Sequence, residues 1–430
     1  MSSTFAALKI RNYRYFATGS FVSNIGTWLQ RVAQDWLVLA LTGSGAALGI
    51  TTGLQFLPIL LFSPIAGVLA DRYPKRKVLT CTQTMMGVAA AILGLLAVTG
   101  FVEVWHVYVL AFVFGVGTAL DAPARQAFVN EMVDNDRLTN AVGLNSASFN
   151  LARMIGPALA GLLIAWMGSG VGATGWVILL NAASYGAVVV SLSMMRASEL
   201  NPVKPLGRAK GQLRDGVRYV RSRPDILLIL AVVFCCGTFG LNFQMTTALM
   251  ATKVYGKGAG EYGILGSIIA IGSLSGSLLA ARRRRPRQRL IVAGAVGFGL
   301  IELVAGLMPS YLTFALILPL CGFAALTVIT AANAFVQMTT GAEMRGRVMA
   351  LYMAIFMGGT PVGAPLLGWI AEHFGARWTL IGGGALTAIG TIAATLWLAN
   401  RQGVRITPHL RPRPGLTIGH IESTEMPAAA

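Results

Sequence analysis

The sequence predicts an all-α membrane protein with twelve transmembrane helices in two pseudo-symmetric six-helix bundles. Of its 430 residues, 55% are hydrophobic and only 12% are charged, and the mean hydropathy is +0.66. A soluble domain carries about 25% charged residues, so this chain cannot cover a soluble surface. Long apolar segments follow one another along the chain, and an internal repeat relates its two halves.

A helix that crosses the hydrocarbon core needs about 20 apolar residues. Twelve segments meet this requirement, six on each side of a polar stretch. They cover residues 16–41, 46–70, 78–99, 104–122, 140–166, 173–195, 226–250, 260–281, 289–308, 311–335, 346–371 and 376–399.

These segments define the expected domains. We expect an N-terminal six-helix bundle over residues 1–195 and a C-terminal six-helix bundle over 226–400. Between them lies a cytoplasmic linker with an interfacial helix, 196–225, and a disordered cytoplasmic tail follows over 401–430. In the linker, Leu213, Val217 and Val220 recur at helical spacing, as in a helix that lies flat on a membrane surface.

The positive charge of the chain predicts its orientation. Lys and Arg number 34 against 16 Asp and Glu, a net charge of +18, which suits either nucleic-acid binding or a cytoplasmic excess of positive charge. With both termini inside, 29 of the 34 basic residues fall on cytoplasmic segments, and only Lys253, Lys257 and Arg377 fall in outer loops. We therefore expect a multi-pass inner-membrane protein in contact with anionic inner-leaflet lipid, and no nucleic-acid partner.

No motif in the sequence indicates an enzyme. Cys81, Cys235, Cys236 and Cys321 all lie in or beside apolar segments, which argues against a disulfide framework or a metal cluster. The sequence has no nucleotide-binding loop and no nucleophile with a matching base. We expect no metal and no cofactor.

An internal repeat links the two halves. Shifted by 207 residues, segment 115–168 aligns without a gap on 322–375, with twelve identities in 54 positions. Glycines account for much of the match, among them the pairs Gly156/Gly363 and Gly161/Gly368. Parallel repeats of this kind are typical of secondary transporters.

A loop motif identifies the family that the chain resembles. Residues 67–77, Gly-Val-Leu-Ala-Asp-Arg-Tyr-Pro-Lys-Arg-Lys, resemble the G-x-x-x-D-R-x-G-R-R/K loop of the major facilitator superfamily, with Pro74 in place of the second glycine. The second copy begins at Gly276 and has Ala280 where the acid would be. Segments 24–28, 121–127 and 155–161 are similar to the exporter branch that includes enterobactin exporters and macrolide efflux pumps.

The resemblance implies a cytoplasmic gate. Asp71 would pair with a neighbouring arginine and face the positive N-terminus of span 11 near Gly346, joining the halves when the inside is closed. A static topology anchor is the alternative. The residues assigned to this gate are Gly67, Asp71, Arg72, Arg76, Asp121 and Arg125.

Polar residues inside the spans are the candidate transport site, because ionisable groups at membrane depth are costly. Arg31, Gln34 and Asp35 share one helical face with Asn24 and Thr27, so that face should line a central cavity. Arg31 and Asp35, one turn apart, can neutralise each other, in a coupling role or as a structural pair.

Three further residues complete this candidate set. Glu302 in span 9 has no charge within one helical turn, which suits a proton carrier unless its side chain reaches the outer interface. Arg153 is placed either to meet an anionic substrate group or to bond to backbone carbonyls, and Asn242 marks a weaker polar face.

A glycine and proline motif lies in span 5. Gly156, Pro157 and Gly161 match part of the motif seen in antiporters of the superfamily, with Ala160 where a second glycine is usual. Proline bends a helix and glycine allows close packing. Bending is also a purely structural device, so the motif favours export only weakly.

The functional hypothesis is a secondary active transporter, expected as a monomer. It would export a small amphipathic molecule, drug-like or a siderophore, by proton antiport with alternating access. A facilitator or importer on the same fold is the alternative, and a membrane receptor or scaffold fits the short outer loops less well.

Overall fold

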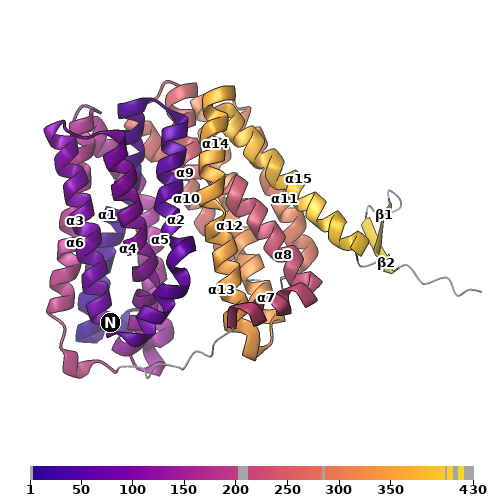
Figure 1. Cartoon of the computed structure of the whole chain (residues 1–430), viewed down its shortest axis with the longest axis horizontal. Coiled ribbons are helices and arrows are strands. Elements are labelled where there is room, and N and C mark those ends of the chain that lie inside the picture. The colour runs from indigo at the N-terminus through magenta and orange to yellow at the C-terminus, as the bar shows by residue number, and fades with distance from the viewer. Residues whose placement is uncertain (1–2, 202–211, 283–285, 402–403, 410–414, 421–430) are drawn as a thin grey trace, which may run out of the picture.

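The computed structural model describes residues 3–201, 212–282, 286–401, 404–409 and 415–420, most of them in long helices (Figure 1). The N-terminal half consists of α1 (Arg11–Thr42), α2 (Gly45–Arg72), α3 (Lys75–Thr99), α4 (Val104–Met132), α5 (Asn135–Trp166) and α6 (Val171–Ser193). Four continuous helices of the C-terminal half are α10 (Ala259–Ala281), α11 (Gln288–Gly306), α12 (Tyr311–Thr339) and α15 (Arg377–Arg401). Short 3₁₀ helices, Ser3–Lys9 and Ala197–Glu199, flank the first half.

Two spans of the C-terminal half are interrupted. Span 7 runs through α8 (Pro224–Cys235), the π-helical turn η3 (Cys236–Gly240), α9 (Phe243–Leu249) and a second π-helical turn, η4 (Met250–Val254). Span 11 is divided into α13 (Ala342–Gly358) and α14 (Thr360–Phe374). π-helical turns occur frequently at functional sites, and glycine and proline are common causes of sharp kinks in helices.

These elements confirm the predicted fold class. Eleven helical segments in the described part of the chain are long and apolar enough to cross a membrane. The segment that falls short is α1, which carries Arg31, Gln34 and Asp35 among its buried or half-buried residues. Since α1 is otherwise a 32-residue helix packed among the membrane helices, it is the twelfth span.

The C-terminal tail differs from the sequence-based expectation. Strands β1 (Val404–His409) and β2 (Gly415–His420) pair antiparallel, so these residues are not disordered as expected for 401–430. Val404, Ile406 and Ile418 are β-branched residues, which favour an extended backbone.

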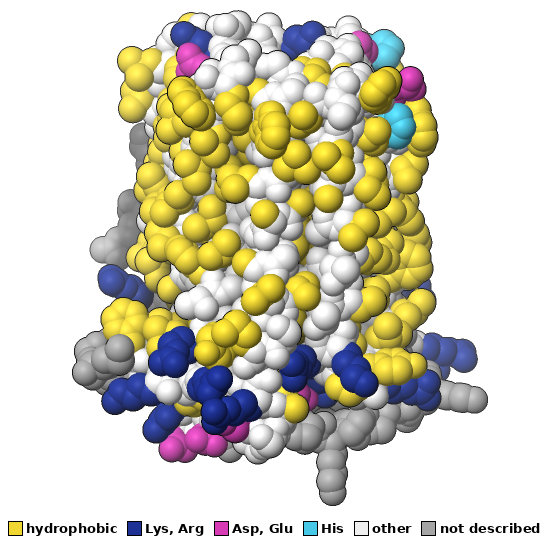
Figure 2. All heavy atoms as spheres, turned by 90° about the vertical axis from the view of Figure 1, so that its left-hand side faces the viewer, with side chains coloured by type: hydrophobic (Ala, Val, Ile, Leu, Met, Phe, Trp, Pro, Cys, Tyr) yellow, Lys and Arg dark blue, Asp and Glu magenta, His cyan; other side chains and the backbone are white. Residues whose placement is uncertain are grey.

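Charged residues divide the bundle into two ends. Figure 2 shows a broad hydrophobic belt, with Lys and Arg side chains gathered at one end of the N-terminal half. We call this the basic end; it carries the N-terminus, the α2–α3 turn at Tyr73 and Pro74, and α7 (Gln212–Ser222). The other end, with the α1–α2 turn at Gly43 and Ser44, is the opposite end.

The packing reproduces the internal repeat. Gly161 of α5 lies against α10, where an added Cβ would be 2.9 Å from Cα of Gly263. Its repeat partner Gly368 of α14 lies against α2, where an added Cβ would be 3.1 Å from Cα of Gly49. Both contacts join one half of the molecule to the other, so the repeated glycines occupy equivalent places in the two halves.

The linker helix α7 packs on the C-terminal half. Asp215 accepts a hydrogen bond of 3.2 Å from Nη1 of Arg347 in α13, and Val220 is buried. Arg214 and Arg218 remain exposed on the other side of the helix. The side of α7 that carries Asp215 and Val220 therefore packs against the C-terminal half.

Candidate transport cavity and gates

A cavity of about 290 Å³ lies between the two halves. Its walls come from α1, α2 and α5 on one side, and from η3, α9, α10, α12, α13 and the first residue of α14 on the other. Aromatic side chains form much of the surface: Trp28, Phe56, Phe243, Tyr262 and Phe356. A pocket with apolar walls and a few polar groups is typical of a small-molecule site.

Two arginines supply the charge of this cavity. Arg31 and Arg153 both line it, and no aspartate or glutamate is among the described residues of its walls. Both guanidinium groups lie over the ring of Trp28, at 4.8 and 5.8 Å from its centroid. The Nε atom of Arg31 is buried without a hydrogen-bond partner. The cavity therefore offers positive charge beside an aromatic surface.

Asp35 connects the two halves just behind the cavity wall. Its Oδ2 accepts hydrogen bonds of 2.7 Å from Nε2 of Gln244 in α9 and of 2.7 Å from the hydroxyl of Tyr262 in α10. The side chain is buried, with 4% of its surface exposed. These contacts replace the direct pair with Arg31 suggested by the sequence, because the Arg31 side chain stacks on Trp28 and Phe56 instead.

Gln34 and Asn242 have different places. Gln34 is buried and donates a long hydrogen bond of 3.5 Å to Oε1 of Gln55 in α2, so it faces its own half and is not among the cavity residues. Asn242 lines the cavity at the interruption of span 7 and donates to the carbonyl of Thr238 at 2.8 Å. Its Oδ1 atom is buried without a partner.

Glu302 lies inside the C-terminal half, and its side chain neither lines the cavity nor reaches the protein surface. Its side chain is completely buried, and neither carboxylate oxygen has a hydrogen-bond partner. It faces η3 and α15, where Cβ atoms added at Gly240 and Gly383 would lie 3.0 and 3.7 Å from its oxygens. The expectation that Glu302 lies in the transport cavity is therefore wrong. The expectation that its carboxylate has no charged partner nearby agrees with the structure.

The helix-bending motif lies at a contact between the halves. Pro157 lines the cavity, and the backbone N–H of Ala158 donates to Oγ of Ser267 in α10 at 3.1 Å. Gly156 packs against Trp28 of α1, and Gly161 packs against Ala259 and Gly263 of α10. The motif therefore brings α5 close to α10 between the cavity and the opposite end.

A second contact closes the opposite end on the other side. Glu372 of α14 accepts hydrogen bonds of 3.0 Å from the hydroxyl of Ser44 and from the backbone N–H of Gly45. A carboxylate at the N-terminus of α2 is stabilised by the unpaired N–H groups there. Together with the contact between α5 and α10, this holds the halves together at the opposite end.

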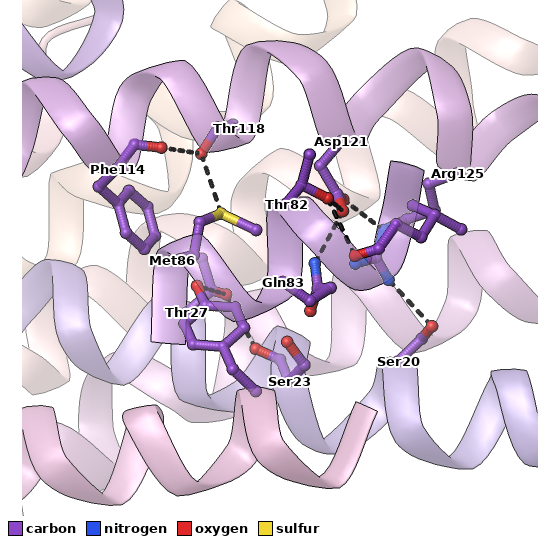
Figure 3. Close-up of polar contacts among 12 residues, drawn as sticks. Ser20, Ser23, Thr27, Thr82, Gln83, Met86, Phe114, Thr118, Asp121 and Arg125 are labelled. Atoms are coloured by element: carbon purple, nitrogen blue, oxygen red, sulfur yellow. Dashed lines mark hydrogen bonds and ion pairs between the residues drawn. The ribbon is translucent and has the colours of Figure 1, made fainter. Parts of the chain in front are cut away.

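Residues assigned to the gate form a polar network within the N-terminal half (Figure 3). Oδ2 of Asp121 accepts from Nε of Arg125 at 2.8 Å, and Oδ1 accepts from Thr82 and Gln83 at 2.9 and 2.8 Å. Arg125 also donates to the Ser20 hydroxyl at 2.9 Å. This network joins α1, α3 and α4 and does not cross between the halves.

The other gate residues are less engaged. Arg76 donates to the backbone carbonyl of Ser193 at 3.0 Å, and Arg72 is exposed. Gly67 lies within α2, and the side chain of Asp71 falls outside the described residues. At the basic end, the described ion pairs stay within one half or between the linker and α13. The latch that Asp71 would form between the halves at the basic end therefore stays a prediction, for a state of the molecule in which that end is closed.

Sequence reasoning missed several partners. Lys75 and Glu131 form a buried ion pair of 3.0 Å between α3 and α4, although 56 positions separate them. Tyr262 and Gln244 were not singled out, and neither was Glu372. A tyrosine in the glycine-rich segment 259–266 was an available signal for Tyr262, but only the tertiary structure places it beside Asp35.

Comparison with known proteins decides the family. The model of the family described as transmembrane secretion effector matches residues 2–408. The chain belongs to this family of major facilitator transporters. Macrolide efflux protein A of Streptococcus pyogenes is 24% identical over 398 residues, covering 89% of this chain and 95% of that protein. Enterobactin exporter of Shigella flexneri is 26% identical over 392 residues, covering 88% and 89%.

Solved structures agree with this fold. A bacterial homologue of the human lysosomal transporter Spinster, in an inward-facing and occupied conformation, superposes with a TM-score of 0.70 at 15% identity and covers 90% of this chain and 96% of that one. The predicted resemblance to exporters of the major facilitator superfamily is confirmed. The chain is a multi-pass membrane transporter, and the relatives named are transporters and not enzymes.

Proposed function

We propose that this protein exports a small amphipathic molecule across the plasma membrane by proton antiport with alternating access. The observation that carries the proposal is the position of Asp35. This ionisable group of one half accepts both of its described hydrogen bonds from the other half, directly behind the cavity wall. Rocking of the halves about a central site must break those bonds, so the charge of Asp35 is coupled to the conformational change.

The closed contacts identify the state of the transport cycle that the structure represents. By the excess of positive charge, the basic end faces the cytoplasm and both termini lie inside. The opposite end, held by Glu372 and by the α5–α10 contact, then faces outward and is shut. In this state the cavity would receive substrate from the cytoplasm, and export requires the outward contacts to separate.

The substrate class follows from the cavity. Its aromatic walls favour an amphipathic ligand, and Arg31 with Arg153 favours one that carries an anionic group. A macrolide and a siderophore are named for relatives of the chain, and both kinds of molecule remain candidates. Glu302, buried without a partner, is the second candidate for the proton-binding group.

Inverted membrane vesicles test the proposal. We expect a radiolabelled macrolide or enterobactin to accumulate when the vesicle lumen is acid, and the accumulation to collapse when a protonophore removes the gradient. Asp35→Asn, which keeps the side-chain shape without the charge, should abolish the dependence on pH. Movement that ignores the gradient would indicate a facilitator, and accumulation in the opposite orientation an importer. Retained proton-driven uptake in Asp35→Asn would contradict the role of Asp35.

A further inference from the structure

A second cavity, which we call the α11–α12 groove, lies in the C-terminal half. It measures about 370 Å³ and is bounded by the end of α10, by α11 and by α12. Small and apolar residues dominate its wall, including Gly294, Gly297, Ala324 and Ala331, and Arg287 lies at one end. A volume above 300 Å³ is in the range of ligand pockets.

The α11–α12 groove opens away from the transport cavity. On α12, Leu326 and Ile329 line the central cavity, whereas Leu320, Thr327 and Ala331 line the groove. At 3.6 residues per turn these two sets lie on different sides of the helix. Leu290 and Leu320 at the rim are 50% and 56% exposed in the protein, so the groove faces the surrounding bilayer.

The length of the groove fits one acyl chain. Arg287 and Ile301 both line it, and a helix rises about 20 Å between these positions at 1.5 Å per residue. The hydrocarbon of one leaflet is about 15 Å deep, half of the 30 Å core. Around Gly297 there is open space, since a Cβ added there would meet no atom within 4 Å.

Positive charge surrounds the end of the α11–α12 groove where Arg287 lies. Arg282, Arg287 and Arg289 are exposed at the basic end, and residues 282–289 include six arginines and no acidic residue. Arg287 thus stands where the apolar groove meets the charged edge of the bundle. A phosphate-bearing headgroup would be complementary to this edge, and a hydrocarbon chain to the groove.

We propose that the α11–α12 groove binds an anionic phospholipid, with one acyl chain between α11 and α12 and the headgroup phosphate against Arg287. The acyl chain moves from the apolar bilayer to an apolar groove, so its transfer contributes little to the binding free energy. The affinity therefore comes from packing and from charge. Selectivity for anionic over zwitterionic lipid with the same acyl chains is therefore the signature of the site. The lipid would lie behind α12, whose other side lines the transport cavity.

Native mass spectrometry on the full chain tests this site. The protein is released from nanodiscs that contain equal amounts of dioleoyl phosphatidylglycerol and dioleoyl phosphatidylcholine, and the retained lipids are counted. We expect phosphatidylglycerol to predominate and Arg287→Ala to reduce that preference about fivefold. Gly297→Leu should reduce phosphatidylglycerol retention several-fold by filling the open space, and Ala324→Leu provides a second filling change.

Matched controls lie in the other half. Gly186 of α6 also has no atom within 4 Å of an added Cβ, and Arg137 is an exposed arginine at the basic end. Gly186→Leu and Arg137→Ala should leave lipid retention unchanged. Equal retention of both lipids, or retention unaffected by both groove-filling changes, would overturn the proposal. A dimer that Gly297→Leu converts to a monomer would also overturn the proposal, because it would show that the groove binds a second copy of the protein.

Discussion

The carboxylate of Asp35 in α1 accepts a hydrogen bond of 2.7 Å from the hydroxyl of Tyr262 in α10, so a charged residue of one half is held by the other. The acceptor is buried and receives a second bond from Gln244. A hydrogen bond to a charged group contributes about 1.5–3 kcal/mol, more than a neutral one. The protonation of this single side chain can therefore change how firmly the two halves are joined.

Removing the Tyr262 hydroxyl should loosen the opposite end. Tyr262→Phe keeps the ring in the cavity wall but deletes one of the two bonds to Asp35, at a cost of about 1.5–3 kcal/mol to the closed state. Spin labels at the exposed positions Gly170 and Lys257, one in each half, report the separation there. We expect longer distances to gain population in Tyr262→Phe. Tyr108→Phe in α4 is the control, and an unchanged distribution for Tyr262→Phe would refute the latch.

Replacing Glu302 should affect coupling and not folding. Its carboxylate is buried without a hydrogen bond, and an unpaired buried charge costs more than a neutral amide of the same shape. Glu302→Gln should therefore unfold at the same temperature as the wild type or a higher one, while proton-driven uptake falls. Thermal unfolding and vesicle uptake measure the two effects. Lower stability with undiminished proton coupling would show that Glu302 is structural.

Gly161 should admit no larger side chain. An added Cβ would lie 2.9 Å from Cα of Gly263, so Gly161→Val forces α5 and α10 apart and costs the closed state about 1–3 kcal/mol. We expect longer distances between labels at Gly170 and Lys257, together with reduced transport. Gly172→Val is the matched control, because a Cβ at Gly172 meets nothing within 4 Å. Equal behaviour of the two variants would contradict the contact.

The pair of Lys75 and Glu131 should be essential for stability. The side chains are 10% and 5% exposed and 3.0 Å apart, so Lys75→Ala leaves a buried carboxylate unpaired. Breaking a buried pair in this way costs about 3–5 kcal/mol. Thermal unfolding should show a clear loss for Lys75→Ala and little change for Arg72→Ala, whose side chain is exposed. A comparably small loss of stability in both variants would contradict a stabilising role for the ion pair between Lys75 and Glu131.

Much of the fold was predictable because membrane helices are long and apolar. The hydrophobic segments predicted all twelve spans, α1 among them despite its charges, to within a few residues at most ends. The glycine repeat predicted equivalent positions for Gly161 and Gly368, which pack on α10 and α2. The interruptions at η3 and Gly359 were not predicted, since an apolar sequence is compatible with both regular and broken helices.

The site was predicted less completely because its contacts join distant segments. Helical spacing placed Arg31 and Asp35 on one face, and Arg31 does line the cavity. Spacing along one helix cannot show that Asp35 is 2.7 Å from groups 209 and 227 positions away. For the same reason Glu302 was expected in the cavity, whereas it faces the interior of its own half.

The central claim is that protons drive the two ends of the molecule to open alternately. The most direct measurement follows two distances by double electron–electron resonance in lipid vesicles, one between labels at Gly170 and Lys257 and the other between labels at Arg137 and Arg345. We predict that lowering the pH lengthens one distance and shortens the other, and that Asp35→Asn combined with Glu302→Gln removes this response. Distances that stay fixed, or that change in the same sense at both ends, would contradict proton-coupled alternating access.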